Sequence, residues 1–199
     1  MPRGASKKPS DRSTLTPAAW VDAATEVLLD QGIDHVRVDA LAIDLGVTRG
    51  SFYWHFRDRE DLLKAVLAAW RDRATEQLTA RLMRVSGDPG AQLHDVLSLP
   101  FRGRAAVRAA RIELAIRAWA RRDASARKAV DEADASRIAY HTKVLGAMGF
   151  SDSEAQMRAF LAYSYEVAES VLQNQGSHAQ RSARTAFVER LLRQALANE

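Results

Sequence analysis

Residues 38–56 contain the stretch VDALAIDLGVTRGSFYWHF, which decides the fold of the N-terminal part of the chain. Its first half places apolar side chains at short helical spacing and is followed by Gly46, a residue type that ends helices in a left-handed conformation. Thr48 suits the N-cap of a second helix, in which Phe52 and Phe56 lie four residues apart and share one face. The spacing predicts two short helices joined by a tight turn, a helix-turn-helix arrangement that enters the major groove of DNA.

The other side chains of this second helix are predicted to face outward. An arginine fork fits the edge of a guanine, Tyr and His donate to phosphate oxygens, and small residues leave room for close approach to DNA. The alternative is that the aromatic side chains complete a small helical core. The outward set comprises Arg49, Gly50, Ser51, Tyr53, Trp54 and His55.

The composition indicates an all-α chain. Its 199 residues are 47% hydrophobic, which is enough for one domain of ordinary size or for a small domain joined to a medium one. Glycine and proline are few, and helical periodicity continues through nearly all of the chain without strand-like alternation. We expect about nine helices, of which the first three form the helix-turn-helix domain and the others form a larger helical domain.

Several functional classes are disfavoured. The chain holds no cysteine, so disulfides and thiolate chemistry are excluded and no metal site is expected. The five histidines are scattered, and neither a Glu-x-x-His pair nor a phosphate-binding glycine loop is present. No apolar run approaches the roughly 18–20 residues that span a bilayer, and no secretory signal is evident. We expect a cytoplasmic protein that is not an enzyme, with no catalytic residue, cofactor or membrane partner.

The charges are sorted along the chain. The net charge is +4, yet residues 1–57 hold as many acidic as basic residues. Asp22, Glu26 and Asp30 recur every four residues on one helix face, an arrangement that can steer DNA to the other side. In residues 102–128 a basic face contains Arg104, Arg108, Arg111 and Arg122. That face is either a solvated surface paired with Asp131, Glu132 and Asp134, or a site for an anionic effector such as an acyl thioester.

Caps and glycine breaks divide the rest of the chain. Residues 1–14 form a polar basic tail, which is either a disordered terminus or an arm that contacts DNA. The helix over 58–84 is long enough to bridge two modules. The other predicted helices span residues 16–32, 91–98, 104–121, 125–148, 152–174 and 180–197.

Residues 16–70 resemble the N-terminal part of TetR-family (tetracycline-repressor-like) transcriptional regulators. The specific part is GVTRGSFYWHF at 46–56, followed by REDLL at 59–63. The resemblance implies that Arg49, Gly50, Ser51 and Trp54 face the major groove. It implies phosphate contacts for Thr48, Tyr53 and His55, a DNA-backbone contact for Arg59, and a possible phosphate contact for Arg37, which stands where members often have a capping Ser or Thr.

The same resemblance divides the chain into a basic arm at 1–14, a DNA-binding domain at 15–58 and an effector-binding and dimerisation domain at 59–199. It implies a repressor that binds a palindromic operator in double-stranded DNA as a homodimer and is released by a small-molecule effector. A helical-bundle enzyme and an effector-independent DNA-binding protein are the alternatives. Apolar side chains on more than one face of helices 152–174 and 180–197 favour a dimer interface there, although a broad internal core is the competing interpretation.

Candidate effector contacts are the aromatic and apolar residues of the second domain together with two polar residues among apolar neighbours. A buried polar group needs a partner, which can be a ligand, a water or another side chain. Ordinary core packing is the alternative for all of them. The candidates are Phe101, Glu113, Ile116, Trp119, Tyr140, His141 and Phe160.

Overall fold

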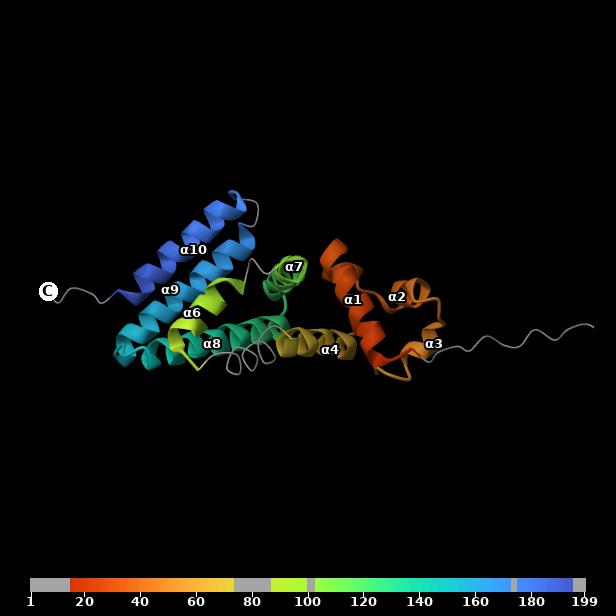
Figure 1. The fold of residues 1–199 in the computed structure, drawn as a ribbon. Coiled ribbons are helices and arrows are strands. Elements are labelled where there is room, and N and C mark those ends of the chain that lie inside the picture. Colours follow the sequence, from red (N-terminus) through yellow and green to blue (C-terminus); the bar gives the residue numbers. More distant parts are fainter. Residues whose placement is uncertain (1–14, 74–86, 100–102, 173–174, 195–199) are drawn as a thin grey trace, which may run out of the picture.

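The computed structural model describes residues 15–73, 87–99, 103–172 and 175–194, and these ranges contain nine α-helices, one short 3₁₀ helix and no strand. The expected all-α class is therefore confirmed. The helices α1, α2 and α3 lie at one end of the molecule, and α8, α9 and α10 lie at the other (Figure 1). The proposed N-terminal arm and Phe101 fall outside the described residues.

The first helix begins and ends where the sequence predicts, whereas α3 ends at Phe52 and leaves Phe56 outside the helix. Thr16 caps α1, its hydroxyl accepting from the amide of Ala19 at 3.4 Å, and Gly32 ends the helix with φ +87°. Two phenylalanine rings of the helix-turn-helix pack beneath α1, and Phe52 meets the ring of Trp20 edge-on at 5.3 Å. The elements are α1 (Pro17–Gln31), η1 (Ile33–His35), α2 (Val38–Asp44) and α3 (Arg49–Phe52).

Helix α4 (Arg59–Arg71) connects this end of the molecule to the bundle. Asp58 caps it, accepting from the amide of Asp61 at 2.8 Å. Its buried side chains join a hydrophobic core that continues from α1 through Trp70 to Ile116 and Trp119. The core is therefore continuous across position 58/59, where the sequence suggests a domain boundary. The expected extension of the helix to residue 84 lies outside the described residues.

The C-terminal helices surround a second core. Helix α8 packs against α7 and α9, and α6 packs against α8 and α10. Ser151 caps α9, and Ser177 forms a reciprocal capping box with Gln180 at the start of α10. The elements are α6 (Pro89–Leu97), α7 (Arg104–Ala120), α8 (Ala124–Ala147), α9 (Asp152–Val171) and α10 (His178–Arg193).

Acidic residues of α1 and η1 pair with arginines that lie later in the chain. The predicted pairing of the basic face with Asp131, Glu132 and Asp134 is therefore wrong for Arg108, Arg111 and Arg122, whereas its alternative role as a site for an anionic effector stays a prediction. Glu26 pairs with Arg108, Asp30 with Arg111 at 3.5 Å, Asp34 with Arg122 at 3.3 Å, and Asp22 with Arg73 at 3.4 Å. We call these four pairs the acid–arginine ladder. The pairs of Arg108 and Arg111 form because α7 packs against α1, whereas Arg122 follows α7 and Arg73 follows α4.

Candidate functional site

The turn between α2 and α3 aims the second helix away from the core. Gly46 has φ +66°, a left-handed conformation that disfavours other residues. The amide of Val47 then donates to the carbonyl of Ala42 at 2.9 Å, which closes the turn. Thr48 stands at the N-cap of α3 in an extended conformation, but its hydroxyl makes no capping hydrogen bond. The predicted capping role of that hydroxyl is therefore wrong.

The aromatic side chains of α3 and of the turn after it divide into an inner and an outer set. Phe52 and Phe56 are 0% and 7% exposed, and their rings stack at 5.5 Å. Trp54 is 86% exposed and Tyr53 is 51% exposed. The outward prediction for these two residues is confirmed, and the alternative that they complete a core is wrong. An indole this exposed is unusual on a surface without a partner.

Arg49 is held at the outer surface by two neighbours. Its Nε lies 3.3 Å from Oδ1 of Asp39 on α2, and its Nη2 donates to the hydroxyl of Tyr53 at 3.1 Å. Because the Tyr53 oxygen accepts here, its own proton remains able to donate to another acceptor. Sequence reasoning missed Asp39, which stands ten positions earlier and meets Arg49 only across the turn.

Gly50 has no internal reason to be a glycine. A Cβ built on it meets only the Thr48 hydroxyl, at an ordinary 3.7 Å, and its φ is not in the left-handed region. Because Gly50 has no side chain, no atom projects from the exposed surface of α3 at this position, next to Arg49. Ser51 and His55 are half-buried on the flanks of this surface.

The two flanking arginines lie differently. Arg37 occupies the N-cap of α2, is exposed, and makes no side-chain capping bond, so this chain lacks the cap that Ser or Thr supplies. Arg59 points back into the domain, where its Nε donates to the carbonyl of Val36 at 2.6 Å and its Nη2 donates to the carbonyl of Ile33 at 2.7 Å. Arg59 therefore ties α4 to η1, whereas its predicted contact with the DNA backbone stays a prediction.

In the second domain, Glu113 finds its partners inside the protein. Its Oε1 accepts from Nη2 of Arg117 at 2.8 Å and from Nη1 of Arg137 at 2.9 Å. Arg117 also binds Asp134, and the hydroxyl of Tyr163 donates to that carboxylate at 2.6 Å. Burial raises the pKa of Glu113, but the two guanidinium groups outweigh it and hold the pKa below its ordinary value.

His141 is likewise satisfied internally. It is 2% exposed, with Nδ1 at 2.6 Å from the carbonyl of Arg137 and Nε2 at 2.6 Å from Oε1 of Glu166. Both neighbours are acceptors, so the doubly protonated ring satisfies both contacts. Burial lowers the pKa of His141, but the carboxylate of Glu166 outweighs it, and the pKa is raised.

The remaining effector candidates separate by burial. Ile116 and Trp119 pack in the core shared with α1 and α4, in agreement with the alternative of ordinary packing. Phe160 is 60% exposed on α9, and its predicted effector contact stays a prediction. Tyr140 is buried, and its hydroxyl has no hydrogen-bond partner in the part of the chain that the structure describes.

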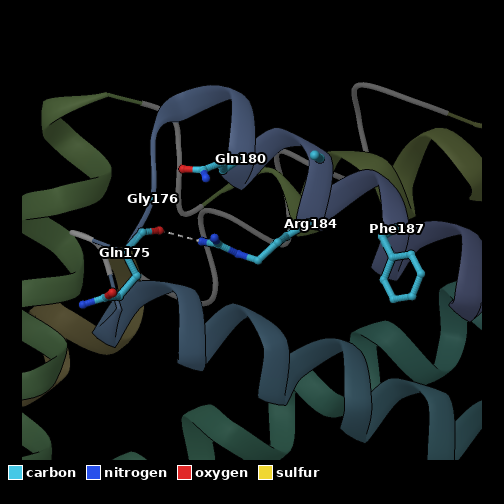
Figure 2. A pocket seen from close by; sticks show the side chains of 6 residues that line it. Gln175, Gly176, Gln180, Arg184 and Phe187 are labelled. Atoms are coloured by element: carbon cyan, nitrogen blue, oxygen red, sulfur yellow. Dashed lines mark hydrogen bonds between the residues drawn. The ribbon is translucent and has the colours of Figure 1, made fainter.

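An exposed apolar face covers α9 and α10. Its members have the i, i+3, i+4 spacing of a helix surface that packs against another element. An open hollow of about 550 Å³ lies beside α10, where it is lined by residues of that helix and by Gln175 and Gly176 of the preceding turn. Figure 2 shows Arg184 extending within this hollow toward the carbonyl of Gln175, with Phe187 on the next turn. The exposed apolar residues are Met157, Phe160, Leu161, Val171, Leu172, Phe187 and Leu191.

Among the helices of the described ranges, none combines the length and the apolar character required to cross a membrane.

Comparison with known sequences identifies the N-terminal part. Residues 21–66 match the model of a family described as bacterial regulatory proteins, tetR family. Over 63 residues the chain is 40% identical to the HTH-type transcriptional regulator SrpR of Pseudomonas putida, a match that covers 32% of this chain and 30% of the relative. The matched segment thus spans less than a third of that relative's length.

Comparison with solved structures extends the likeness to the whole fold. A transcriptional regulator from Rhodococcus sp. Rha1 superimposes with a TM-score of 0.71 at 20% identity, covering 89% of this chain and 96% of the other. The FadR regulator of Bacillus subtilis, solved in complex with stearoyl-CoA, gives a TM-score of 0.66 at 18% identity and covers 92% and 100%. At these identities the likeness establishes the arrangement of helices.

Proposed function

We propose that this chain is a transcriptional repressor of the tetR family, whose model residues 21–66 match, and that it binds a palindromic operator as a homodimer and leaves it when a small molecule binds. The observation that carries the proposal is the outer surface of α3 and the turn after it. Trp54 is 86% exposed there, beside an arginine, a tyrosine hydroxyl and a glycine that the fold does not require.

The proposed division of labour follows from the chemistry of these side chains. Arg49 and Trp54 contact bases in the major groove, and Gly50 with Ser51 allows the helix to approach closely. Phosphates are contacted by Thr48, Tyr53 and His55. The Tyr53 hydroxyl accepts from Arg49, so its own proton is available to donate to a phosphate oxygen. Base contacts specify the site, and phosphate contacts fix the orientation of the helix.

The homodimer is proposed to form through the apolar face of α9 and α10. A two-fold interface must be complementary to itself, and a continuous apolar face with a hollow beside it meets that need. The face lies at the opposite end of the molecule from α3, so two recognition helices stay free when two copies join there (Figure 1). Two such helices read half-sites about 34 Å apart, one turn of DNA.

Release by an effector requires a ligand whose affinity differs between two arrangements of the helices. We propose that α4 and the acid–arginine ladder transmit the change, because they connect the bundle to the DNA-binding end. Movement of α7 relative to α1 alters the separation of the two recognition helices in the dimer.

We propose that the Tyr140 hydroxyl contacts the effector. A buried hydroxyl without a partner costs free energy, and a ligand that accepts its proton recovers it. Glu113 and His141 are proposed to hold α7, α8 and α9 around that ligand, because their side chains are already engaged with arginines and Glu166.

Selection of bound duplexes from a random DNA library tests this function. The purified chain is expected to enrich an inverted repeat, and the Arg49→Ala variant is expected to enrich a more degenerate one. Lack of any enriched sequence would contradict the proposal. Once the repeat is known, effector candidates follow from displacement of a labelled repeat, with the Tyr140→Phe variant as the test of the proposed contact.

A further inference from the structure

Asp39 lies beside the proposed DNA-contacting residues and holds the arginine among them. Its carboxylate reaches from the first turn of α2 to Nε of Arg49, 3.3 Å away at the start of α3. The hydroxyl of Tyr53, at the end of α3, accepts from Nη2 of the same guanidinium at 3.1 Å. The guanidinium carbon also lies 5.8 Å from the centroid of the Tyr53 ring. One cation is thus held from two helices.

These contacts determine which N–H groups of Arg49 remain. A guanidinium has five N–H donors in a fixed planar fork. Asp39 engages Nε, and Tyr53 takes one proton of Nη2, so three protons remain on the two terminal nitrogens. Guanine presents O6 and N7 as two adjacent acceptors in the major groove, and a pair of terminal N–H groups matches them.

The charge of Asp39 also determines whether Arg49 binds a phosphate or a guanine edge more strongly. A phosphate must compete with the carboxylate for the cation, because both partners are anionic and bind arginine strongly. A guanine edge carries no net charge and contacts the far end of the fork while Asp39 stays in place. The Asp39 carboxylate therefore weakens the binding of Arg49 to phosphates, which is independent of DNA sequence, more than it weakens the binding of Arg49 to a guanine.

We propose that Asp39 is a positioning residue for sequence recognition, which directs the Arg49 fork to a guanine edge and withdraws it from phosphates. The inference rests on the DNA-binding function proposed above. The Asp39–Arg49 contact is present in the protein without DNA, so it can be measured in the free protein.

The test compares an enriched duplex with a scrambled duplex at several salt concentrations. The Asp39→Asn variant keeps the shape of the side chain and removes its charge. We expect tighter binding to scrambled DNA, a steeper salt dependence by about one phosphate contact, and a preference for the enriched duplex that falls about tenfold. The Asp44→Asn variant removes the same charge from the exposed end of α2 and is expected to change both affinities alike.

A second background separates positioning from direct contact. In Arg49→Ala protein, the Asp39→Asn substitution is expected to leave the remaining preference unchanged. An effect of the same size in that background would overturn the inference, since Asp39 then acts without Arg49. An equal rise in both affinities for Asp39→Asn, matching Asp44→Asn, would overturn it as well.

A measurement without DNA distinguishes failure of this inference from failure of the proposed function. The ¹⁵Nε–¹H signal of Arg49 in the free protein is expected to move in Asp39→Asn but not in Asp44→Asn. A signal that is the same in both variants overturns the inference whatever the chain binds. If the Arg49 signal moves in Asp39→Asn but the protein enriches no DNA sequence, the Asp39–Arg49 contact is supported and its role in DNA recognition is overturned.

Discussion

Gly50 shows how the absence of a side chain points to function. Its backbone conformation is open to any residue, and a Cβ meets only the Thr48 hydroxyl at 3.7 Å. The fold therefore gives no reason for glycine at this helical position, where alanine is the better helix former. Under the proposed function, the space that glycine leaves on the outer surface of α3 is occupied by DNA.

The Gly50→Ala variant is expected to be as stable as the parent or more stable by about 0.5–1 kcal/mol, because alanine reduces the conformational entropy of the unfolded chain. Its affinity for the enriched repeat is expected to fall. Denaturant unfolding and DNA titration measure the two effects. As a control, Gly46→Ala places a side chain at φ +66° and is expected to cost about 1 kcal/mol or more of stability. Unchanged DNA affinity in Gly50→Ala contradicts close approach at this residue.

Residue-scale prediction worked where local spacing decides the answer. The four-residue spacing of Phe52 and Phe56 places them inward, and Trp54 between them must then point outward. Prediction did not reach the internal contacts of Arg59, whose guanidinium donates to the carbonyls of Ile33 and Val36, more than twenty positions earlier. It missed Asp39 for a similar reason, because a sequence does not say which side chains meet across a turn.

The helices themselves meet through charge as well as through apolar contacts. The pairs of the acid–arginine ladder are about half exposed, so each is worth about 0–1 kcal/mol and is weakened by salt. Their importance lies in joining α1 to the second domain at several points along one face.

A double-mutant cycle on Glu26 and Arg108 measures that connection. Glu26→Gln and Arg108→Gln are each expected to lower stability by less than about 1 kcal/mol, and the double variant is expected to lower it by less than the sum. The coupling is expected to shrink in 1 M salt. The exposed Arg127–Asp131 pair within α8 is the control for loss of a pair on one helix. Additive effects at low salt would show that the ladder does not join the helices.

The contact of His141 with Glu166 makes the junction of α8 and α9 sensitive to pH. Arg137, Tyr140 and Tyr163 also face the ring and act on its titration. The folded-state pKa is raised above the ordinary value of 6.5, so protonation stabilises the folded state. The contribution is fully present below the ordinary pKa and is lost as the pH rises through the folded-state pKa.

We therefore expect the free energy of unfolding to decrease as the pH is raised from 6 toward and above the folded-state pKa of His141. The Glu166→Gln variant removes the main stabilising charge and is expected to flatten that dependence. Denaturant unfolding at a series of pH values provides the measurement, with NMR titration of His141 to identify the group. A pH dependence that is identical in Glu166→Gln would assign it to other residues.

Element boundaries were largely predictable, whereas element partners were not. Periodicity, Gly32 and the cap at Ser151 define the ends of α1 and the start of α9 within a residue or two. The stripe on α1 was visible in the sequence as Asp22, Glu26 and Asp30. Its pairing with α7 was not, because a periodic stripe reveals a face and not the element that covers it.

At the scale of the whole molecule, α3 lies at the opposite end from α9 and α10, which carry the apolar face (Figure 1). Two copies joined at the apolar face present two recognition helices outward. The Leu161→Glu variant puts a charge at a residue that is 60% exposed in the single chain, so it should spare the fold and disrupt the dimer.

Sedimentation is expected to give a dimer for the parent and a monomer for Leu161→Glu, with unchanged helix content. The Val107→Glu variant also charges an exposed apolar residue, on α7 and outside that face, and is expected to stay dimeric. A dimeric Leu161→Glu protein would place the interface elsewhere.

The most direct test of the central claim is a hydroxyl-radical footprint of the parent and of Leu161→Glu on the enriched duplex. Two copies reading one inverted repeat should protect two patches on one face of the DNA, about one helical turn apart, and both should weaken together in Leu161→Glu. A single protected patch, or two patches that Leu161→Glu leaves intact, would contradict a dimer joined through α9 and α10.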